Sequence, residues 1–297
     1  MPLNAAAVET LVAIVDHGTF EAAARALHLT PSAVSQRVRA LEREVGRVVV
    51  RRGTPCEPTD AGAALVRWGR QVRLLEAEAR ASIGEETGPV VLDVAVNADS
   101  LATWFRDVLR EVGRRGDLAV RLVVEDQAHS ADLLRGGDTL AAVTSDPHPV
   151  QGCRSEPLGT LRYRPAATPD LAERHRRGRG TDWQRMPVVV FNAKDDLQHG
   201  FLRERGVTEP DVVHVVPTSA DFHEAVRCGL GWGMLPTPQL DPDLEEGLLR
   251  TLAGRAHHDV ALHWQRWRIE SASLATLSDL VRAAAGEHLR PAAMIQR

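Results

Sequence analysis

Apolar positions near the N-terminus recur at the three- and four-residue steps of helices. This spacing predicts a first helix from Leu3 to Val15, which His17 and Gly18 close because glycine readily adopts the left-handed conformation that ends helices. Thr19 then fits the N-cap of a second helix, whose alanine-rich face permits close crossing by a neighbour. The pattern therefore predicts two short helices packed closely together.

A third helical pattern separates apolar from polar side chains more sharply than the first two. Thr30 and Pro31 fit its N-cap and its first position. Its apolar face carries Val34, Val38, Leu41 and Val45. Its opposite face carries Ser32, Ser35, Gln36, Arg39 and Arg43. One side therefore packs into a core while the other offers hydrogen-bonding groups and cations, as the recognition helix of a helix-turn-helix does. An ordinary amphipathic surface helix is the competing interpretation.

The run from Arg47 to Arg52 is short, rich in valine and prone to form a strand. Two prolines, Pro55 and Pro58, follow and favour a chain reversal. A hairpin wing beside the recognition helix would bring Arg51 and Arg52 near the DNA backbone. A solvated edge strand is the alternative for either arginine.

A long helix is predicted from about Asp60 to Glu86, with Thr59 as its N-cap. Its apolar positions alternate steps of three and four: Leu65, Trp68, Val72, Leu75 and Ala79. This alternation is typical of a seam between two helices, so we expect the helix to link two domains and to dimerise. Packing onto its own domain is the alternative.

Strands and helices alternate beyond residue 88, which predicts an α/β fold with a parallel sheet. The pattern gives a buried strand from Val90 to Val96, a helix from about Leu101 to Val112 and a strand from Leu118 to Glu125. Further strands are predicted at 141–144, 161–164, 188–191, 213–216, 233–235 and 259–264, with helices at 130–135 and 273–285.

Charge is distributed unevenly along the chain. A net charge of −4 over 297 residues by itself disfavours a nucleic-acid binder. From Arg25 to Arg52, however, seven arginines stand against Glu42 and Glu44, a local balance of +5. A basic head on an acidic body is typical of a DNA-binding domain with a separate sensing domain, and the length fits two or three domains.

Other features bound the class of protein. A run of eighteen apolar residues and a signal peptide are both missing from the sequence, so we expect a cytoplasmic protein with no membrane contact. The three cysteines are few and far apart, which favours a reducing compartment. His257, His258 and His263 lack the spacing of a metal site, and the common hydrolase and phosphate-loop motifs are missing. We therefore expect no catalytic residues, no metal and no enzyme activity.

The stretch GTFEAAARALHLTPSAVSQRVRALEREVGRVVVRR, followed by PTDAGAAL, resembles the winged helix-turn-helix signature of LysR-type transcriptional regulators. The resemblance implies a winged helix-turn-helix over residues 1–59, a linker helix over 60–87 and a two-lobed effector domain like periplasmic binding proteins over 88–297. Lobe I would span about 88–163 and 265–297, and lobe II about 164–264, with crossings near Tyr163 and His263. The implied partners are promoter DNA, a second copy in a homodimer or homotetramer, and RNA polymerase.

Candidate DNA contacts come from the head. Ser32, Ser35 and Gln36 would read bases, and phosphates would be held by Thr19, Arg39, Arg51 and Arg52. The full candidate set is Thr19, Thr30, Pro31, Ser32, Ser35, Gln36, Arg39, Arg51 and Arg52.

The stretch NADSLATWF, from Asn97 to Phe105, places a carboxylate beside a helix start at the end of a strand. Free N–H groups there could bind the carboxylate of an amino acid, and Asp99 could bind its cation. Simple N-capping by Asp99 or Ser100 is the alternative.

This stretch, with VEDQ, AVT and GLGWGMLP further along, is similar to the LysG/ArgP subfamily, the regulators of basic amino-acid exporters. The resemblance implies lysine or arginine, and sometimes histidine, as the co-effector, with no other cofactor. The candidate effector contacts are Asp99, Ser100, Thr103, Asp126, Asp196, Thr218 and Ser219.

Two alternatives stay open at this point. Cys153 and Cys228 could make the protein a thiol redox sensor, although buried structural cysteines are the plainer interpretation. An architectural or origin-binding DNA protein without an effector is the second alternative.

Overall fold

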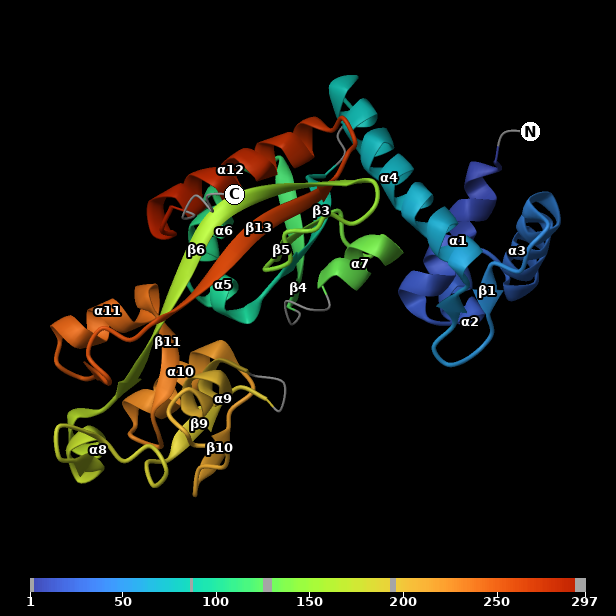
Figure 1. The fold of residues 1–297 in the computed structure, drawn as a ribbon. Coiled ribbons are helices and arrows are strands. Elements are labelled where there is room, and N and C mark those ends of the chain that lie inside the picture. The colour runs from blue at the N-terminus through green and yellow to red at the C-terminus, as the bar shows by residue number, and fades with distance from the viewer. Residues whose placement is uncertain (1–2, 86–87, 125–129, 193–195, 292–297) are drawn as a thin grey trace.

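The computed structural model describes residues 3–85, 88–124, 130–192 and 196–291 of the chain. A helical head lies at one end, a long helix leads away from it, and an elongated body of two lobes follows (Figure 1). Among the described residues, no helix is both long enough and apolar enough to span a membrane.

Three helices form the head, and side chains cap each of them. Asn4, Thr19 and Thr30 accept backbone N–H groups at the three helix starts. Gly18 (φ 74°) ends the first helix in the left-handed conformation, as the sequence predicted, and Gly46 (φ 68°) ends the third helix in the same way. The helices, whose apolar faces share one core, are α1 (Ala5–His17), α2 (Phe20–Ala26) and α3 (Pro31–Val45).

A short hairpin follows α3 and forms the predicted wing. Its strands β1 (Val50–Arg51) and β2 (Glu57–Pro58) pair antiparallel. The predicted run from Arg47 to Arg52 is therefore a strand over only two residues. Val49 and Val50 are buried in the same core as the head helices, which holds the wing beside α3.

The linker helix α4 (Asp60–Ser82) begins at the predicted N-cap Thr59. It ends earlier than predicted, because Gly84 adopts a left-handed conformation (φ 78°) that α-helices do not continue through. Glu86, the predicted end, lies outside the described residues.

The predicted seam of α4 divides between two environments. Leu65 and Trp68 lie half-buried against the head core, so this part of α4 packs onto its own chain. Leu74 is buried in the core of the body, whereas Leu75 is 42% exposed. A seam between two copies through Val72 and Leu75 stays a prediction.

The body is built on one mixed sheet, so the prediction of a parallel sheet was wrong in part. Its strands are β3 (Val90–Val96), β4 (Leu118–Val124), β5 (Ala141–Thr144), β6 (Cys153–Ala167), β11 (Gly233–Pro236), β12 (Arg250–Thr251) and β13 (His258–Trp267). β3 pairs in parallel with β4 and β5, whereas β13 runs antiparallel to β5 and β6. The order is β11-β6-β13-β5-β3-β4, and β12 also pairs with β6. The chain's return along β13 in the opposite direction makes the sheet mixed.

Helices cover both faces of the part that we call lobe I, which holds β3, β4 and β5. The aromatic residues Phe105 and Trp264 are buried in the core beneath α6 (Phe105–Arg115) and α12 (Ala272–His288). Ala95 and Ala142 face the opposite way, against α7 (Ser130–Gly136). This alternation follows from the period of two along each strand.

The single helix predicted from Leu101 to Val112 is two helices. α5 (Ala98–Ala102) ends at Thr103, and α6 begins at Phe105. Trp104 lies at the break and is 1% exposed. Burying this large side chain favours the change of direction that sequence periodicity did not reveal.

Two long antiparallel strands connect the lobes (Figure 1). β6 has 15 residues, far longer than the predicted segment 161–164, and it pairs with β13 from Cys153 to Tyr163. Beyond this point β6 pairs with β11 and β12. His258 lies opposite Tyr163, whereas His263 pairs with Thr144 inside lobe I. The return between lobes is therefore near His258, and the expectation of His263 was wrong.

Lobe II lies between the C-terminal end of β6 and the N-terminal end of β13 in the sequence. Its parallel pair β9 and β10 is connected to the segment before β11 by a bridge between Val188 and Trp232. A small antiparallel hairpin, β7 with β8, pairs Arg176 with Thr181 and Arg177 with Gly180. The elements are α8 (Pro169–Arg174), β7 (Arg176–Arg177), β8 (Gly180–Thr181), β9 (Val188–Val190), α9 (Asp196–Arg203), β10 (Val213–Val215), α10 (Ser219–Arg227) and α11 (Thr237–Glu245).

Candidate DNA-binding face and interlobe cleft

The outward face of α3 carries the side chains that the sequence analysis predicts to contact bases. Ser32 and Gln36 are exposed, and Ser35 is half-buried. The hydroxyl of Thr30 accepts the backbone N–H of Ala33 at 3.2 Å and lies 3.0 Å from the Ser32 hydroxyl. The N-cap therefore fixes the start of α3 and orients the first polar side chain on its outer face.

Arginines flank this face. Arg39 and Arg51 are exposed, and the Arg52 guanidinium lies 5.0 Å from the ring centroid of Phe20. The stacking holds Arg52 against α2 while its charge stays available to a phosphate. Thr19, another candidate, caps α2 by accepting the N–H of Ala22 at 3.1 Å.

A hollow of about 1060 Å³ lies along the C-terminal half of α3 and the segment after it. Arg43 and Arg47 line it together with the predicted residues Gln36 and Arg39. Neither Arg43 nor Arg47 was among the predicted contacts. The high density of arginines from Arg25 to Arg52 is the sequence feature that could have identified them as candidates.

A cleft of about 740 Å³ lies between the lobes. Its lobe I wall carries Asn97, Ala98, Asp99, Val124 and Ser145. Its lobe II wall carries Phe191, Asn192, Asp196, Leu197, Gln198, Pro217, Phe222, Met234, Pro236 and Gln239. The residues 258–261 of β13 close it between the lobes. The lining mixes apolar and polar side chains, as binding sites for small molecules do.

Asp99 joins the two lobes across this cleft. The Ser219 hydroxyl of lobe II donates to one carboxylate oxygen at 2.7 Å, and the Tyr163 hydroxyl of β6 donates to the other at 2.8 Å. Burial raises the pKa of the Asp99 carboxyl, and the two hydrogen bonds act in the opposite direction. Asp99 and Ser219, both predicted effector contacts, are therefore hydrogen-bonded to each other, and Tyr163 is the third member of this group.

The start of α5 is capped by a residue that the sequence analysis did not name. Asn97 is the N-cap, because its side-chain oxygen accepts the N–H of Ser100 at 2.8 Å. The Leu101 N–H bonds the Asn97 carbonyl at 3.0 Å. The N–H groups of Ser100 and Leu101 are therefore already used inside α5, and capping by Asp99 or Ser100 was wrong.

The Ser100 side chain is fully buried behind the cleft wall, and its hydroxyl has no partner in the described part of the chain. Thr103 donates to the Asp99 carbonyl at 2.6 Å and caps the end of α5. Neither residue lines the cleft, so both support its wall rather than face a ligand there.

The remaining candidate effector contacts are Asp196, Thr218 and Asp126. Asp196 lines the cleft but is exposed and paired with Arg203 at 2.7 Å. Thr218 is exposed and caps α10, accepting the Asp221 N–H at 3.2 Å. Asp126 lies outside the described residues.

The sequence analysis missed two residues of this region, Tyr163, which bonds Asp99, and Asp259, which lines the cleft. Tyr163 was noted only as a crossing point, and the contribution of Asp259 was not foreseen. Asp259 lines the cleft but forms a bidentate pair with Arg162 at 2.7 and 2.6 Å, which lowers the pKa of its carboxyl. Only the register between β6 and β13 brings these two residues together.

The comparisons with known proteins agree with this architecture. Residues 6–63 match the bacterial regulatory helix-turn-helix protein of the LysR family, and residues 88–286 match the LysR substrate binding domain. The chain belongs to the LysR family of transcriptional regulators. The predicted fold class is thereby confirmed: a winged helix-turn-helix, a linker helix and a two-lobed effector domain.

Full-length relatives cover nearly the whole of this LysR-type chain. The lysine export transcriptional regulatory protein LysG of Corynebacterium glutamicum is 45% identical over 291 residues, covering 97% of this chain and 100% of LysG. The full-length structure of that LysG with bound effector Arg has a TM-score of 0.82, with 45% identity over 97% of this chain and 100% of the other. The structure of ArgP from Mycobacterium tuberculosis has a TM-score of 0.85, with 42% identity, covering 96% and 98% of the two chains.

The thiols of this LysR-type regulator do not favour redox sensing. Burial raises the pKa of Cys153 to about 11. Cys228 is exposed, and its hydrogen bond with Glu224 raises its pKa as well. Both thiols therefore stay protonated at neutral pH, whereas a reactive cysteine needs a thiolate.

A substitution in the recognition helix tests the DNA-binding face. Gln36→Ala should cost about 1–3 kcal/mol of binding at one base position and relax the preference there, because a bidentate contact to a base edge is lost. Arg51→Ala should weaken binding to all sequences alike and reduce the salt slope by about one unit. Operator titrations at several salt concentrations measure both effects, with Arg110→Ala on lobe I as the control. Unchanged discrimination by Gln36→Ala would show that another face reads the DNA.

Asp99→Asn tests whether the buried carboxylate destabilises the ligand-free protein. An acid whose pKa is raised by folding stabilises the fold below its unfolded pKa, and this contribution is lost as the pH rises through the folded pKa. Asp99→Asn should therefore raise the melting temperature at pH 7 and change it less in acid, where Asp99 itself is neutral. Thermal unfolding across this pH range measures it. A lower melting temperature at pH 7 would mean that the carboxylate stabilises the fold.

Proposed function

We propose that this LysR-type regulator binds a basic amino acid in the interlobe cleft and controls transcription of an exporter for basic amino acids. The observation that carries the proposal is the buried carboxylate of Asp99, whose partners are the hydroxyls of Ser219 and Tyr163. No cation of the described residues is among the groups that shift its pKa. A buried charge needs a counter-charge, and a ligand ammonium or guanidinium would supply it.

The relatives support the same effector class. LysG of Corynebacterium glutamicum is named for lysine export, and its structure holds Arg as effector. Lysine and arginine share a carboxylate, an ammonium and a long cationic side chain. A cleft of about 740 Å³ whose lining includes Asp99 and Asp196 can hold such a molecule.

The ligand would bind with one cationic group at Asp99. Asp196 at the rim, although paired with Arg203, is the next acid for the second cation. Ser219 would turn its hydroxyl toward the ligand when the ammonium takes its place at Asp99. The contributions of Ser100 and Thr103 are indirect, through the shape of α5. Thr218 on α10 would contact the ligand carboxylate.

The head would bind promoter DNA through the outward face of α3 and the wing. Ser32, Ser35 and Gln36 would read base edges, while Arg39, Arg51 and Arg52 hold phosphates. Thr19, Thr30 and Pro31 would set the positions of α2 and α3 against the backbone. We place the protein in the cytoplasm with RNA polymerase as a further partner, because its target is a promoter.

Two copies would associate along α4, as a homodimer or as the dimers of a tetramer. Leu75 is 42% exposed on a helix whose neighbouring position Leu74 is buried. An exposed leucine on the predicted seam fits contact with a second linker helix. A fixed dimer would also set the spacing of two DNA half-sites.

Calorimetry tests the effector assignment. The wild-type chain should bind lysine or arginine, and Asp99→Asn should weaken both far more than it weakens a neutral analogue such as norleucine. The expected loss is tenfold or more, on the order of 1.4 kcal/mol, because a charge-assisted hydrogen bond becomes a neutral one.

The matched control is Asp259→Asn, since that acid also lines the cleft but already has Arg162 as its counter-charge. Equal losses for lysine and for norleucine would remove Asp99 from the recognition of the cation. Wild-type protein that binds no basic amino acid would refute the proposed effector.

Leu75→Glu tests association along α4. The added charge is exposed in the single chain, so the fold should persist, but at a helix–helix seam the charge would be buried at high cost. Light scattering should show a shift toward monomer, and operator binding should fall. Glu76→Ala, at the adjacent exposed position, is the control. A variant that keeps the wild-type mass would place the dimer contact elsewhere.

A further inference from the structure

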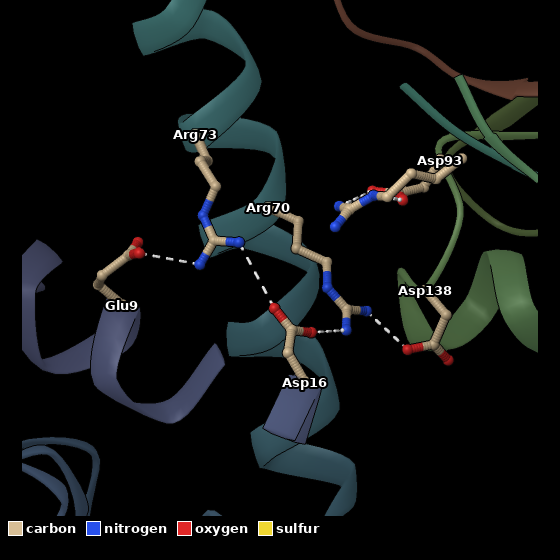
Figure 2. Close-up of polar contacts among 7 residues, drawn as sticks. Glu9, Asp16, Arg70, Arg73, Asp93 and Asp138 are labelled. Carbon is tan, nitrogen blue, oxygen red and sulfur yellow. Dashed lines mark hydrogen bonds and ion pairs between the residues drawn. The ribbon is translucent and has the colours of Figure 1, made fainter. Parts of the chain in front are cut away.

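Three arginines on one stretch of α4, Arg67, Arg70 and Arg73, bond the head, lobe I or both. Figure 2 shows Arg70 and Arg73 with their partners. Arg73 bonds the head alone, to Glu9 at 2.9 Å and to Asp16 at 3.5 Å. Arg67 bonds lobe I alone, donating to the Arg135 carbonyl at 2.8 Å. Arg70 lies between them and bonds both parts.

The guanidinium of Arg70 is shared by two carboxylates from different domains. One nitrogen lies 2.5 Å from Asp16 at the end of α1, and another lies 2.6 Å from Asp138, just after α7. The Arg70 side chain is 15% exposed, whereas Asp138 is 45% exposed. Two carboxylates hold this largely buried guanidinium in a fixed geometry. Isolated ion pairs on the surface, by contrast, contribute little to stability.

The backbone of lobe I touches the linker helix beside this bridge. Gly137 adopts a left-handed conformation (φ 74°), and a Cβ atom there would lie 2.6 Å from the Cβ of Arg67. The turn that carries Asp138 is therefore seated directly on α4. The Arg67 guanidinium also lies 5.0 Å from the ring centroid of Trp267 in β13.

The head also packs tightly against the same stretch of α4. A Cβ atom on Gly69 would lie 2.9 Å from methyl groups of both Val8 and Val12 in α1. The helix segment 67–73 thus has the head against one side and lobe I against another. A displacement of the turn at Asp138 cannot be absorbed by loose packing on either side.

We propose that Arg70 is the positioning residue that fixes the DNA-binding head relative to lobe I through its simultaneous bonds to Asp16 and Asp138. When lobe I shifts against the linker helix, the Asp138 bond breaks or moves, and the head is freed or reoriented on its own chain. In a dimer this changes the relative placement of the two DNA-reading helices. The inference concerns transmission to the head and goes beyond the proposed effector.

Asp138→Asn in the full-length protein tests the bridge, because the residue is exposed and the change keeps its shape. Lysine or arginine affinity measured by calorimetry should be unchanged. The ratio of operator affinities with and without that amino acid should change by about fivefold or more, the usual range for coupled sites. Asp138→Glu keeps the carboxylate and should retain most of the wild-type ratio.

Asp132→Asn is the matched control, since it removes an exposed pair with Arg135 on the same face of lobe I without touching the head. Gly137→Val should reproduce the effect of Asp138→Asn by a different route, by pushing the turn away from α4. An unchanged ratio in both variants would overturn the proposal. A fall in amino-acid affinity equal to the change in the ratio would also overturn it, because Asp138 would then act on the cleft.

Hydrogen exchange provides a readout that needs no effector. In ligand-free protein, Asp138→Asn should speed amide exchange in α1 and in α7 several-fold relative to Asp132→Asn, because the restraint between the two parts is lost. Unchanged exchange in α1 would refute the role of Arg70 as a positioning residue. If the protein proves to bind no basic amino acid, the effector assignment fails, and this measurement still decides the bridge.

Discussion

The antiparallel ladder of β6 and β13 is the interaction on which the sensor depends. It continues from the centre of lobe I to the start of lobe II, so both lobes share one set of backbone hydrogen bonds. The ladder places Tyr163 opposite His258, where its hydroxyl reaches Asp99. Asp99 and Ser219 meet above this point, one from each lobe. The two strands hold the lobes side by side, and one apolar core cluster continues from Phe105 in lobe I to Trp232 in lobe II, with the cleft beside it.

Asp99 shows how such a cleft can be ready for a ligand. Two hydroxyls satisfy the carboxylate by hydrogen bonding, but hydroxyls do not neutralise its charge. The same bond from Ser219 connects the lobes, so a cation arriving at Asp99 would compete with an interlobe contact. Under the proposed function, effector binding and the relative position of the lobes would be linked through this one side chain, at some cost in stability.

The linker helix extends this linkage toward DNA. Its glycine at position 69 admits α1, and Gly137 of lobe I lies against it at Arg67. Between these close approaches, Arg70 bonds a carboxylate of each part. The head and the sensor are thus joined by packing and by charge along a short stretch of one helix.

The sequence by itself determined the head, because capping residues, left-handed glycines and apolar spacing act over only a few positions. Gly18, Thr19 and Thr30 were placed correctly on this local information. It also identified β3 and the pairing of an acid with a strand end at Asn97 to Ser100. The tertiary structure alone decided the length of β6, the mixed sheet, the contact of Asp99 with Tyr163 and Ser219, and the shared guanidinium of Arg70. The contacts of Arg70 with Asp16 and of Asp99 with Tyr163 and Ser219 alone join residues 54 to 120 positions apart. Strand register and domain packing set them, and no local propensity encodes either.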